Sequence, residues 1–144
     1  MIFEVLGQPM GKQRPKFTTM GRYVKVYTPQ QTINYETQIK LSYQQQCKEY
    51  FGKEPIKVHI KAYFKIPKSY SFKKKLQCID GKIRPTTKPD VDNVAKAVLD
   101  ALQNGVAFEN DTQVVELSIE KWYSIEPRLL ISIEKEQEDA ETSK

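Results

Sequence analysis

Apolar and polar residues alternate along five segments of the chain, which is the pattern of half-buried β-strands. The clearest segment runs from Pro55 to Ile66, where every second residue is apolar and most of the others are lysines. One face of this strand is therefore expected to join the core, and the other to carry positive charge. The remaining strands are expected at Met1–Leu6, Arg22–Tyr27, Gln113–Tyr123 and Arg128–Glu134, with the last two forming an antiparallel hairpin.

A first helix is expected between Thr28 and Gly52. The residues from Thr28 to Gln31 have the form of a capping box with proline at the first helical position, and glycine is a typical helix end. Apolar residues recur between these limits at intervals of about four, at Tyr35, Ile39, Tyr43, Cys47 and Tyr50. This stripe is typical of a core or dimer surface, although tyrosines can also stack on bases.

A second helix is expected after Pro89 and before Asn104-Gly105, a typical helix stop. Its apolar stripe consists of Val94, Val98, Ala101 and Leu102, thickened by Ala95, Ala97 and Leu99. Asp92, Lys96 and Asp100 recur every four residues and therefore line a polar stripe. The simplest interpretation of this polar stripe is a set of surface ion pairs.

Together these elements predict a single small α+β domain, with a mixed or antiparallel sheet of about five strands and two main helices. The 144 residues fit one domain, without internal repeats. The segment 134–144 is acidic, with Ala140 as its one apolar residue, and is expected to be a disordered tail. We detect no membrane helix or signal peptide, and Cys47 and Cys78 lack metal-ligand spacing, so we expect a cytoplasmic protein with reduced thiols.

The overall net charge of +5 is unevenly distributed. Residues 1–88 contain 18 Lys and Arg against 5 Asp and Glu, whereas residues 89–133 contain 3 against 8. A basic part therefore precedes an acidic segment. An anionic polymer whose chemistry needs a divalent cation would suit both parts, which points to nucleic acid.

Several basic clusters are candidates for phosphate contacts, although each can also be read as a solvated surface. The segment from Gly7 to Lys16 is rich in glycine and proline and reads as a clamp on the phosphate backbone. Ser71 is expected to cap a short helix whose three lysines oppose the helix dipole unless an anion offsets them. The candidate residues are Lys12, Arg14, Lys16, Lys57, Lys61, Lys65, Lys73, Lys74, Lys75, Arg84 and Lys88.

Two carboxylates, Asp90 and Asp92, straddle the expected start of the second helix, and a third, Asp111, precedes a strand. Helix starts favour anions, and Mg²⁺ prefers oxygen ligands and needs few carboxylates. Aspartates at such positions more often act as helix caps or turn residues. On spacing alone, both interpretations remain open.

The segment from Lys88 to Val114 resembles the core of the RusA family of Holliday junction resolvases. It shares Lys88-Pro89-Asp90-Val91-Asp92-Asn93, then Lys96, Asp100 and Leu102 in step, then the turn Asn110-Asp111-Thr112-Gln113-Val114. Family members often have two aspartates in this turn, so Asn110 marks a missing carboxylate, which counts against a second metal.

The resemblance implies a RusA-like nuclease domain over residues 1–133, in a family that is often phage- or prophage-encoded. Its metal-binding aspartates fall on Asp90, Asp92 and Asp111, and its catalytic lysine on Lys96. It implies a Mg²⁺-dependent homodimer, with Mn²⁺ as a possible substitute, that resolves four-way junctions by paired symmetric nicks in recombination and repair. The alternatives are a junction- or duplex-binding protein that does not cut, and a nuclease of the same fold that acts on flaps or forks.

Overall fold

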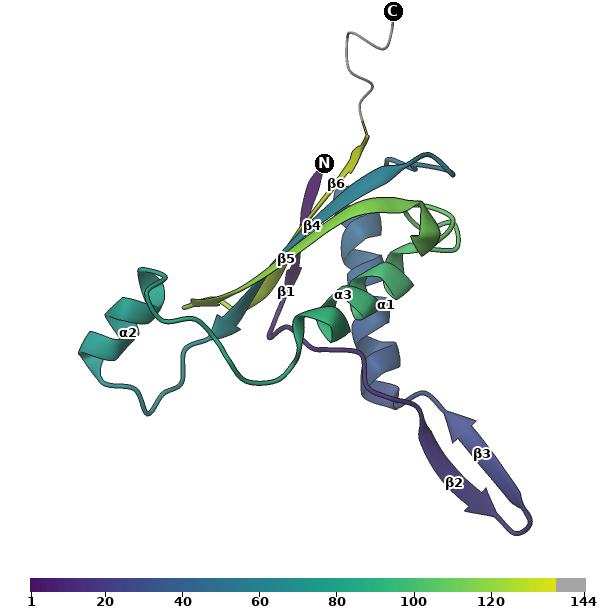
Figure 1. The fold of residues 1–144 in the computed structure, drawn as a ribbon, viewed down its shortest axis with the longest axis horizontal. Coiled ribbons are helices and arrows are strands. Elements are labelled where there is room, and N and C mark those ends of the chain that lie inside the picture. Colours follow the sequence, from purple (N-terminus) through teal and green to yellow (C-terminus); the bar gives the residue numbers. More distant parts are fainter. Residues whose placement is uncertain (137–144) are drawn as a thin grey trace, which may run out of the picture.

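A four-stranded mixed sheet forms the centre of the computed structural model, which describes residues 1–136 apart from the Met20 side chain (Figure 1). Its strands lie in the order β1-β6-β4-β5, where β4 is antiparallel to β6 and parallel to β5. Their bounds are β1 Ile2–Leu6, β4 Ile56–Lys65, β5 Val114–Ser124 and β6 Arg128–Lys135. The expected α+β class and mixed sheet are therefore confirmed. Residues 137–144 of the expected tail lie outside the described part.

The predicted hairpin of the last two strands is wrong, because β4 lies between β5 and β6. Alternation specifies which face of a strand is buried but not which strand is its neighbour. The link from Ser124 to Arg128 passes the end of β4 and has to cross two strand spacings, about 10 Å, which four residue steps span easily. This arrangement gives β4, whose alternate residues are fully buried, a partner on each side.

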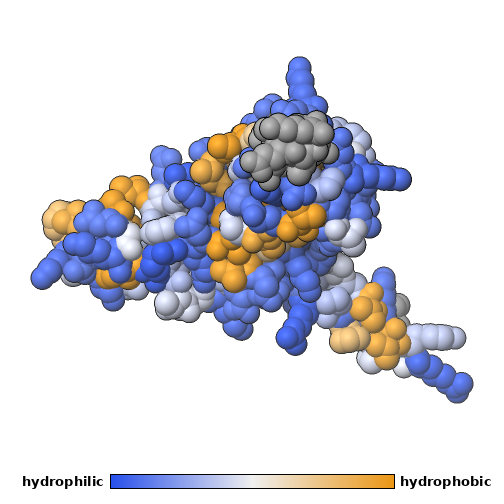
Figure 2. Space-filling view, turned by 45° about the horizontal axis from the view of Figure 1, so that its top comes forward, coloured by the Kyte–Doolittle hydropathy of each residue, from blue (hydrophilic) through white to orange (hydrophobic). Residues whose placement is uncertain are grey.

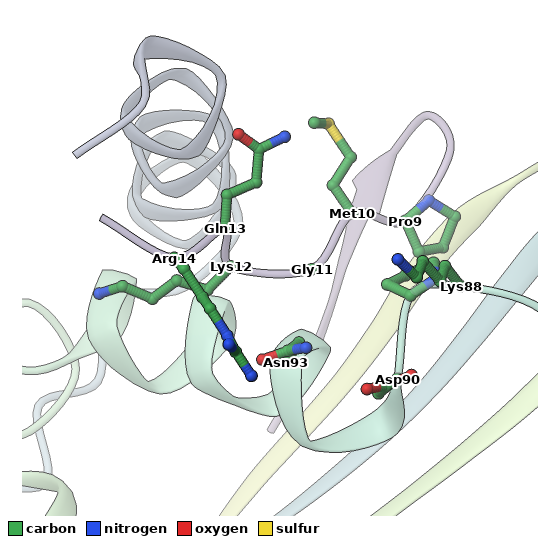
Figure 3. A pocket seen from close by; sticks show the side chains of 10 residues that line it. Pro9, Met10, Gly11, Lys12, Gln13, Arg14, Lys88, Asp90 and Asn93 are labelled. Carbon is green, nitrogen blue, oxygen red and sulfur yellow. The ribbon is translucent and has the colours of Figure 1, made fainter. Parts of the chain in front are cut away.

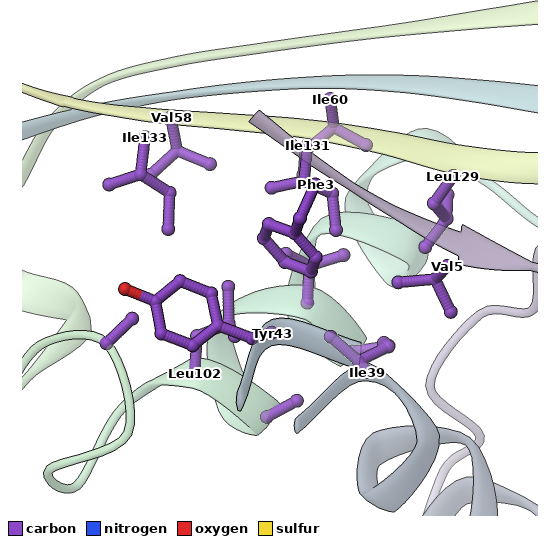
Figure 4. Packing of buried hydrophobic residues seen from close by; sticks show 14 of the residues in the cluster. Phe3, Val5, Ile39, Tyr43, Val58, Ile60, Leu102, Leu129, Ile131 and Ile133 are labelled. Atoms are coloured by element: carbon purple, nitrogen blue, oxygen red, sulfur yellow. The ribbon is translucent and has the colours of Figure 1, made fainter. Parts of the chain in front are cut away.

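Two helices, α1 (Gln30–Gln46) and α3 (Val91–Leu102), cover one face of the sheet (Figure 1). The apolar stripe of α3 is buried as predicted. Figure 4 shows Ile39 and Tyr43 of α1 opposite the side chains of the sheet, and the Phe3 and Tyr43 rings lie edge to face at 5.2 Å. Tyr35 and Tyr43 of the stripe therefore belong to the core rather than to a surface for stacking bases, whereas Tyr50 lies beyond the end of α1 and is exposed.

The predicted ends of α1 are wrong. Pro29 is the cap residue rather than the first helical residue, and no side chain caps this end, so the capping box does not form. The helix stops at Gln46, and the following chain leaves it so that Cys47 and Phe51 can reach the core. The backbone N–H of Phe51 donates to the carbonyl of Ala107, which ties this segment to the loop after α3.

Two smaller units extend from this body in different directions (Figure 1). The strands β2 (Lys16–Met20) and β3 (Tyr23–Tyr27) form a separate antiparallel hairpin, of which only the second strand was predicted. On the other side, α2 (Phe72–Ile79) begins at Ser71, whose hydroxyl oxygen accepts the N–H of Lys74 at 3.2 Å as predicted. None of the helices in residues 1–136 is both long and apolar enough to span a membrane.

Candidate active site and nucleic-acid interface

The start of α3 presents two carboxylates to solvent. Asp90 is the cap residue, but its side chain accepts no capping hydrogen bond, and Asp92 lies in the first turn. Both residues are exposed. Asp90 therefore occupies the cap position but does not cap the helix with its side chain, so its carboxylate is free to bind another group. The positive end of the helix dipole favours anions at this end of α3.

The segment from Gly7 to Pro15 crosses directly over this end of α3. The backbone N–H of Lys12 donates to the carbonyl of Asn93 at 2.9 Å. A Cβ on Gly11 would lie 2.8 Å from the Cβ of Pro89 and 3.0 Å from that of Asn93, so this crossing requires glycine. We call this segment the basic loop.

A hollow of about 760 Å³ lies between the basic loop and the start of α3. Figure 3 shows Lys88 and Asp90 at its edge, and the Arg14 side chain extending from the loop toward Asn93. A smaller hollow of about 290 Å³ continues along α3 and includes Arg14 and Lys96 in its lining. Cationic side chains therefore line both hollows beside the carboxylate end of the helix, an arrangement that suits a phosphate group next to a metal ion.

Lys96 is exposed on the polar stripe of α3. The ion pairs expected between it and Asp92 or Asp100 do not form, and within residues 1–136 its ammonium group has no carboxylate partner within 4 Å. Asp100 instead pairs with Lys12 of the basic loop. The ammonium group of Lys96 thus remains free for a ligand.

Lys12, by contrast, is occupied by the protein itself. Its Nζ contacts the carboxylate of Asp100 and lies 3.5 Å from Oε1 of Glu36. Hydrogen bonding to Asp100 raises the pKa of Lys12, and burial raises the pKa of Glu36. Lys12, although predicted to bind DNA, therefore ties the basic loop to α1 and α3. Arg14 has no such ion pair within residues 1–136 and is the cation of the basic loop that can bind a ligand. The spacing of the sequence gives no sign of Glu36 as a partner.

Asp111 lies at the opposite end of α3. It begins a single 3₁₀ turn, Asp111–Gln113, and its backbone N–H donates to Oε1 of Gln103, the residue that ends α3. Twelve helical residues span about 18 Å, so α3 separates Asp111 from Asp90 and Asp92. Within residues 1–136 no three His, Cys, Asp or Glu side chains gather closely enough to hold a metal ion. One chain thus places two of the three predicted ligands at the same end of α3, and the metal-binding roles of all three stay predictions.

The lysines of β4 lie on the sheet face away from the helices, as predicted, but acidic residues lie beside them. In the sheet register Lys57 is next to both Glu116 and Glu134, and Lys61 is next to Glu120. These glutamates belong to strands far away in the sequence, so the alternation within β4 gave no sign of them. DNA contact by Lys57, Lys61 and Lys65 stays a prediction on a face of mixed charge.

Two of the remaining basic candidates, Lys74 and Arg84, lie against aromatic rings. The ammonium group of Lys74 lies 3.8 Å from the centre of the Tyr70 ring, and Lys73 is exposed beside it. The guanidinium group of Arg84 stacks on Trp122 at 3.4 Å, and its Nε donates to a backbone carbonyl of β5. Cation–π contacts hold these groups in place but leave their charges able to attract phosphate.

Comparison with known proteins gives two matches. A family model described as endodeoxyribonuclease RusA matches residues 7–134, which include the basic loop, the whole of α3 and Asp111. The chain is also 38% identical over 133 residues to a protein of Bacillus subtilis (strain 168) named Uncharacterized protein YqaN. That match covers 91% of this chain and 93% of the relative.

Proposed function

Because the chain belongs to the RusA family of endodeoxyribonucleases, we propose that it cuts branched DNA, with four-way junctions as its substrate. The observation that supports this proposal best is the start of α3. There the carboxylates of Asp90 and Asp92 are exposed, the Asp90 side chain makes no capping hydrogen bond, and Asp90 lines the same hollow as Arg14 of the basic loop. A protein that only bound DNA would gain nothing from carboxylates here, because they repel phosphate.

We propose Mg²⁺ as the metal ion, with Mn²⁺ as a substitute. Asp90 and Asp92 offer hard oxygen donors at one helix start, and carboxylate oxygens suit a cation that keeps several of its waters. When bound, the metal would polarise the scissile phosphodiester and lower the pKa of a water molecule. Both proposed ligands would come from one helix end, which would favour a fixed position for the reacting phosphate.

The cations of the site would hold the DNA strand and stabilise developing charge. Lys96 lies one turn after Asp92, and its free ammonium group would stabilise negative charge on the phosphate in the transition state. Arg14 and Lys88 line the hollow and would contact neighbouring phosphates, positioning the strand without reading its bases. The N–H groups at the start of α3 favour an anion at the same place.

We propose that the protein acts as a two-fold dimer in which Asp111 completes the site of the partner protomer. Paired nicks on opposed strands require two identical sites, and two-fold symmetry provides them. If the two α3 helices were antiparallel across the dimer axis, the Asp111 end of one would lie beside the Asp90 end of the other. This arrangement would bring together the carboxylates that α3 separates within one chain.

Cleavage of a labelled synthetic four-way junction tests the proposal, with linear duplex, flap and fork of the same sequence as controls. We expect paired symmetric nicks that are confined to the junction, need Mg²⁺ or Mn²⁺ and disappear with a chelator. Tight binding without cutting in either metal would make this a junction-binding protein. Preferred cutting of flaps or forks would keep the nuclease activity but change its substrate.

A further inference from the structure

The β2–β3 hairpin extends away from the sheet and helices as a two-stranded ribbon (Figure 1). Neither face of the ribbon is covered, and Tyr23 beside its turn is 79% exposed. A ribbon with only two strands is marginally stable alone and gains stability from what packs against it. The hairpin is therefore a surface that lacks its partner within the described residues.

The strand register divides the hairpin into two different faces. On one face Lys16 pairs with Tyr27 and Thr18 with Lys25, and Tyr23 follows on the same side. We call this the polar face. The opposite, apolar face contains Phe17, Thr19, Val24 and Val26. In Figure 2 the hairpin, at the lower right, shows apolar surface directly beside hydrophilic side chains.

The positive charge of the hairpin and its flanking segments favours an anionic partner. The chain from Val5 to Tyr35 contains five Lys and Arg and no Asp or Glu. Three of these cations, Lys16, Arg22 and Lys25, belong to the hairpin and its turn. No acidic side chain of the hairpin would repel a phosphate backbone, in contrast to the mixed charge around β4.

The hairpin is also continuous with the proposed cleavage site. Arg14 and Pro15 line the hollow along α3, and β2 begins at the next residue, Lys16. A DNA strand held by Arg14 would therefore continue onto the polar face of the hairpin. A two-stranded ribbon fits the width of a DNA groove, and tyrosine rings stack on exposed bases.

We propose that this hairpin is a branch-recognition arm, a contact that rests on the proposed function and extends it to the choice of substrate. Lys16 and Lys25 hold phosphates on one DNA arm, and the Tyr23 ring stacks on a base left uncovered where the arms meet. A linear duplex buries its base faces in continuous stacking and offers Tyr23 no partner. The hairpin thereby distinguishes branched DNA from linear DNA without reading its sequence.

Binding without divalent cations tests this arm separately from cleavage. Fluorescence anisotropy would compare a four-way junction with a linear duplex of the same sequence, for Tyr23→Ser and for wild type. Stacking of one base contributes about 1–3 kcal/mol, so we expect junction affinity to fall roughly 5- to 150-fold while duplex affinity stays unchanged. For Lys16→Gln/Lys25→Gln, the slope of log affinity against log salt should fall in magnitude by about two.

The matched control changes the other face of the same ribbon. Val24→Thr/Val26→Thr keeps β-branched residues, so the ribbon keeps its strand propensity, and junction binding should stay at wild-type level. Wild-type junction affinity of Tyr23→Ser would overturn the proposal. In that case sedimentation of Val24→Thr/Val26→Thr would show whether the apolar face instead joins two copies of the chain: a monomer where wild type forms a dimer would replace the recognition arm by a dimer contact.

The outcomes separate this proposal from the nuclease assignment. If the protein binds junctions through Tyr23 but never cuts them, the recognition arm is supported and the proposed nuclease function is refuted. If Tyr23→Ser binds and cuts junctions as well as wild type does, the nuclease function is supported and the recognition arm is refuted. Circular dichroism of each variant shows that the fold is intact, which we expect because the hairpin contributes no residue to the core.

Discussion

Replacing Gly11 by alanine should move the basic loop away from α3 and impair cleavage more than folding. The new Cβ would lie 2.8 Å from the Cβ of Pro89, whereas non-bonded carbons prefer about 3.5–4.0 Å. The loop therefore has to withdraw by roughly 1 Å. This movement weakens the hydrogen bond from the Lys12 N–H to Asn93, which contributes about 1 kcal/mol, and forced packing costs about 1–3 kcal/mol.

The effect on cleavage should be larger, because a 1 Å displacement in an active site costs about 100-fold in rate. Single-turnover cleavage of a four-way junction would measure this rate, and urea unfolding would measure the free energy of unfolding. Gly52→Ala is the matched control. Its Cβ meets no atom within 4 Å, but its φ of +59° is strained for alanine, so it should lose about 1 kcal/mol of stability.

The control should cleave at close to the wild-type rate, because its new Cβ displaces neither the basic loop nor the nearby turn that contains Asp111. If Gly11→Ala loses stability but cleaves as fast as Gly52→Ala, the position of the loop over α3 does not matter for catalysis, and the site described above is wrong. If both variants slow cleavage equally, general destabilisation explains the result.

Three further experiments address the carboxylates. Asp92→Asn should abolish cleavage but leave junction binding equal or tighter, because it removes a negative charge; wild-type nicking rates would refute the metal site. Mixed dimers of Asp92→Asn and Asp111→Asn protomers should regain one nick per junction if Asp111 acts in the partner's site, whereas two sites each within one chain would both stay dead. Glu36→Gln should raise stability at pH 7 relative to wild type, because burial raises the folded-state pKa of Glu36 above its unfolded value. The charged form then costs stability above that unfolded value, so the advantage should vanish as urea unfolding is repeated toward pH 4, and a constant difference would exclude this cause.

The sequence predicted those parts of the molecule that depend on local periodicity. The stripe of α3 and the alternation of β4 each fix a buried face within one element, and the structure confirms both. The position of Asp90 at a helix start followed equally from its place after a proline. These features need no knowledge of distant residues, which is why spacing was enough.

The parts that were not predicted depend on contacts between distant segments. Nothing within β5 or β6 indicates that β4 would lie between them. Lys12 forms ion pairs with Glu36 and Asp100, and these two carboxylates come together only when α1 and α3 pack side by side. Likewise, the distance between Asp90 and Asp111 follows from the length of an intervening helix rather than from their similar chemistry.

The pairing of β1 with β6 has a consequence for how the protein is made. Among the strands of residues 1–136, β1 pairs with β6 alone, and Gly7, where the basic loop begins, donates to the carbonyl of Pro127. A ribosome therefore has to synthesise the chain as far as β6 before the start of this loop acquires its partner strand. We expect a chain that has not yet reached β6 to lack the complete form of the proposed cleavage site. The strand order would then delay cleavage of DNA until the sheet can form.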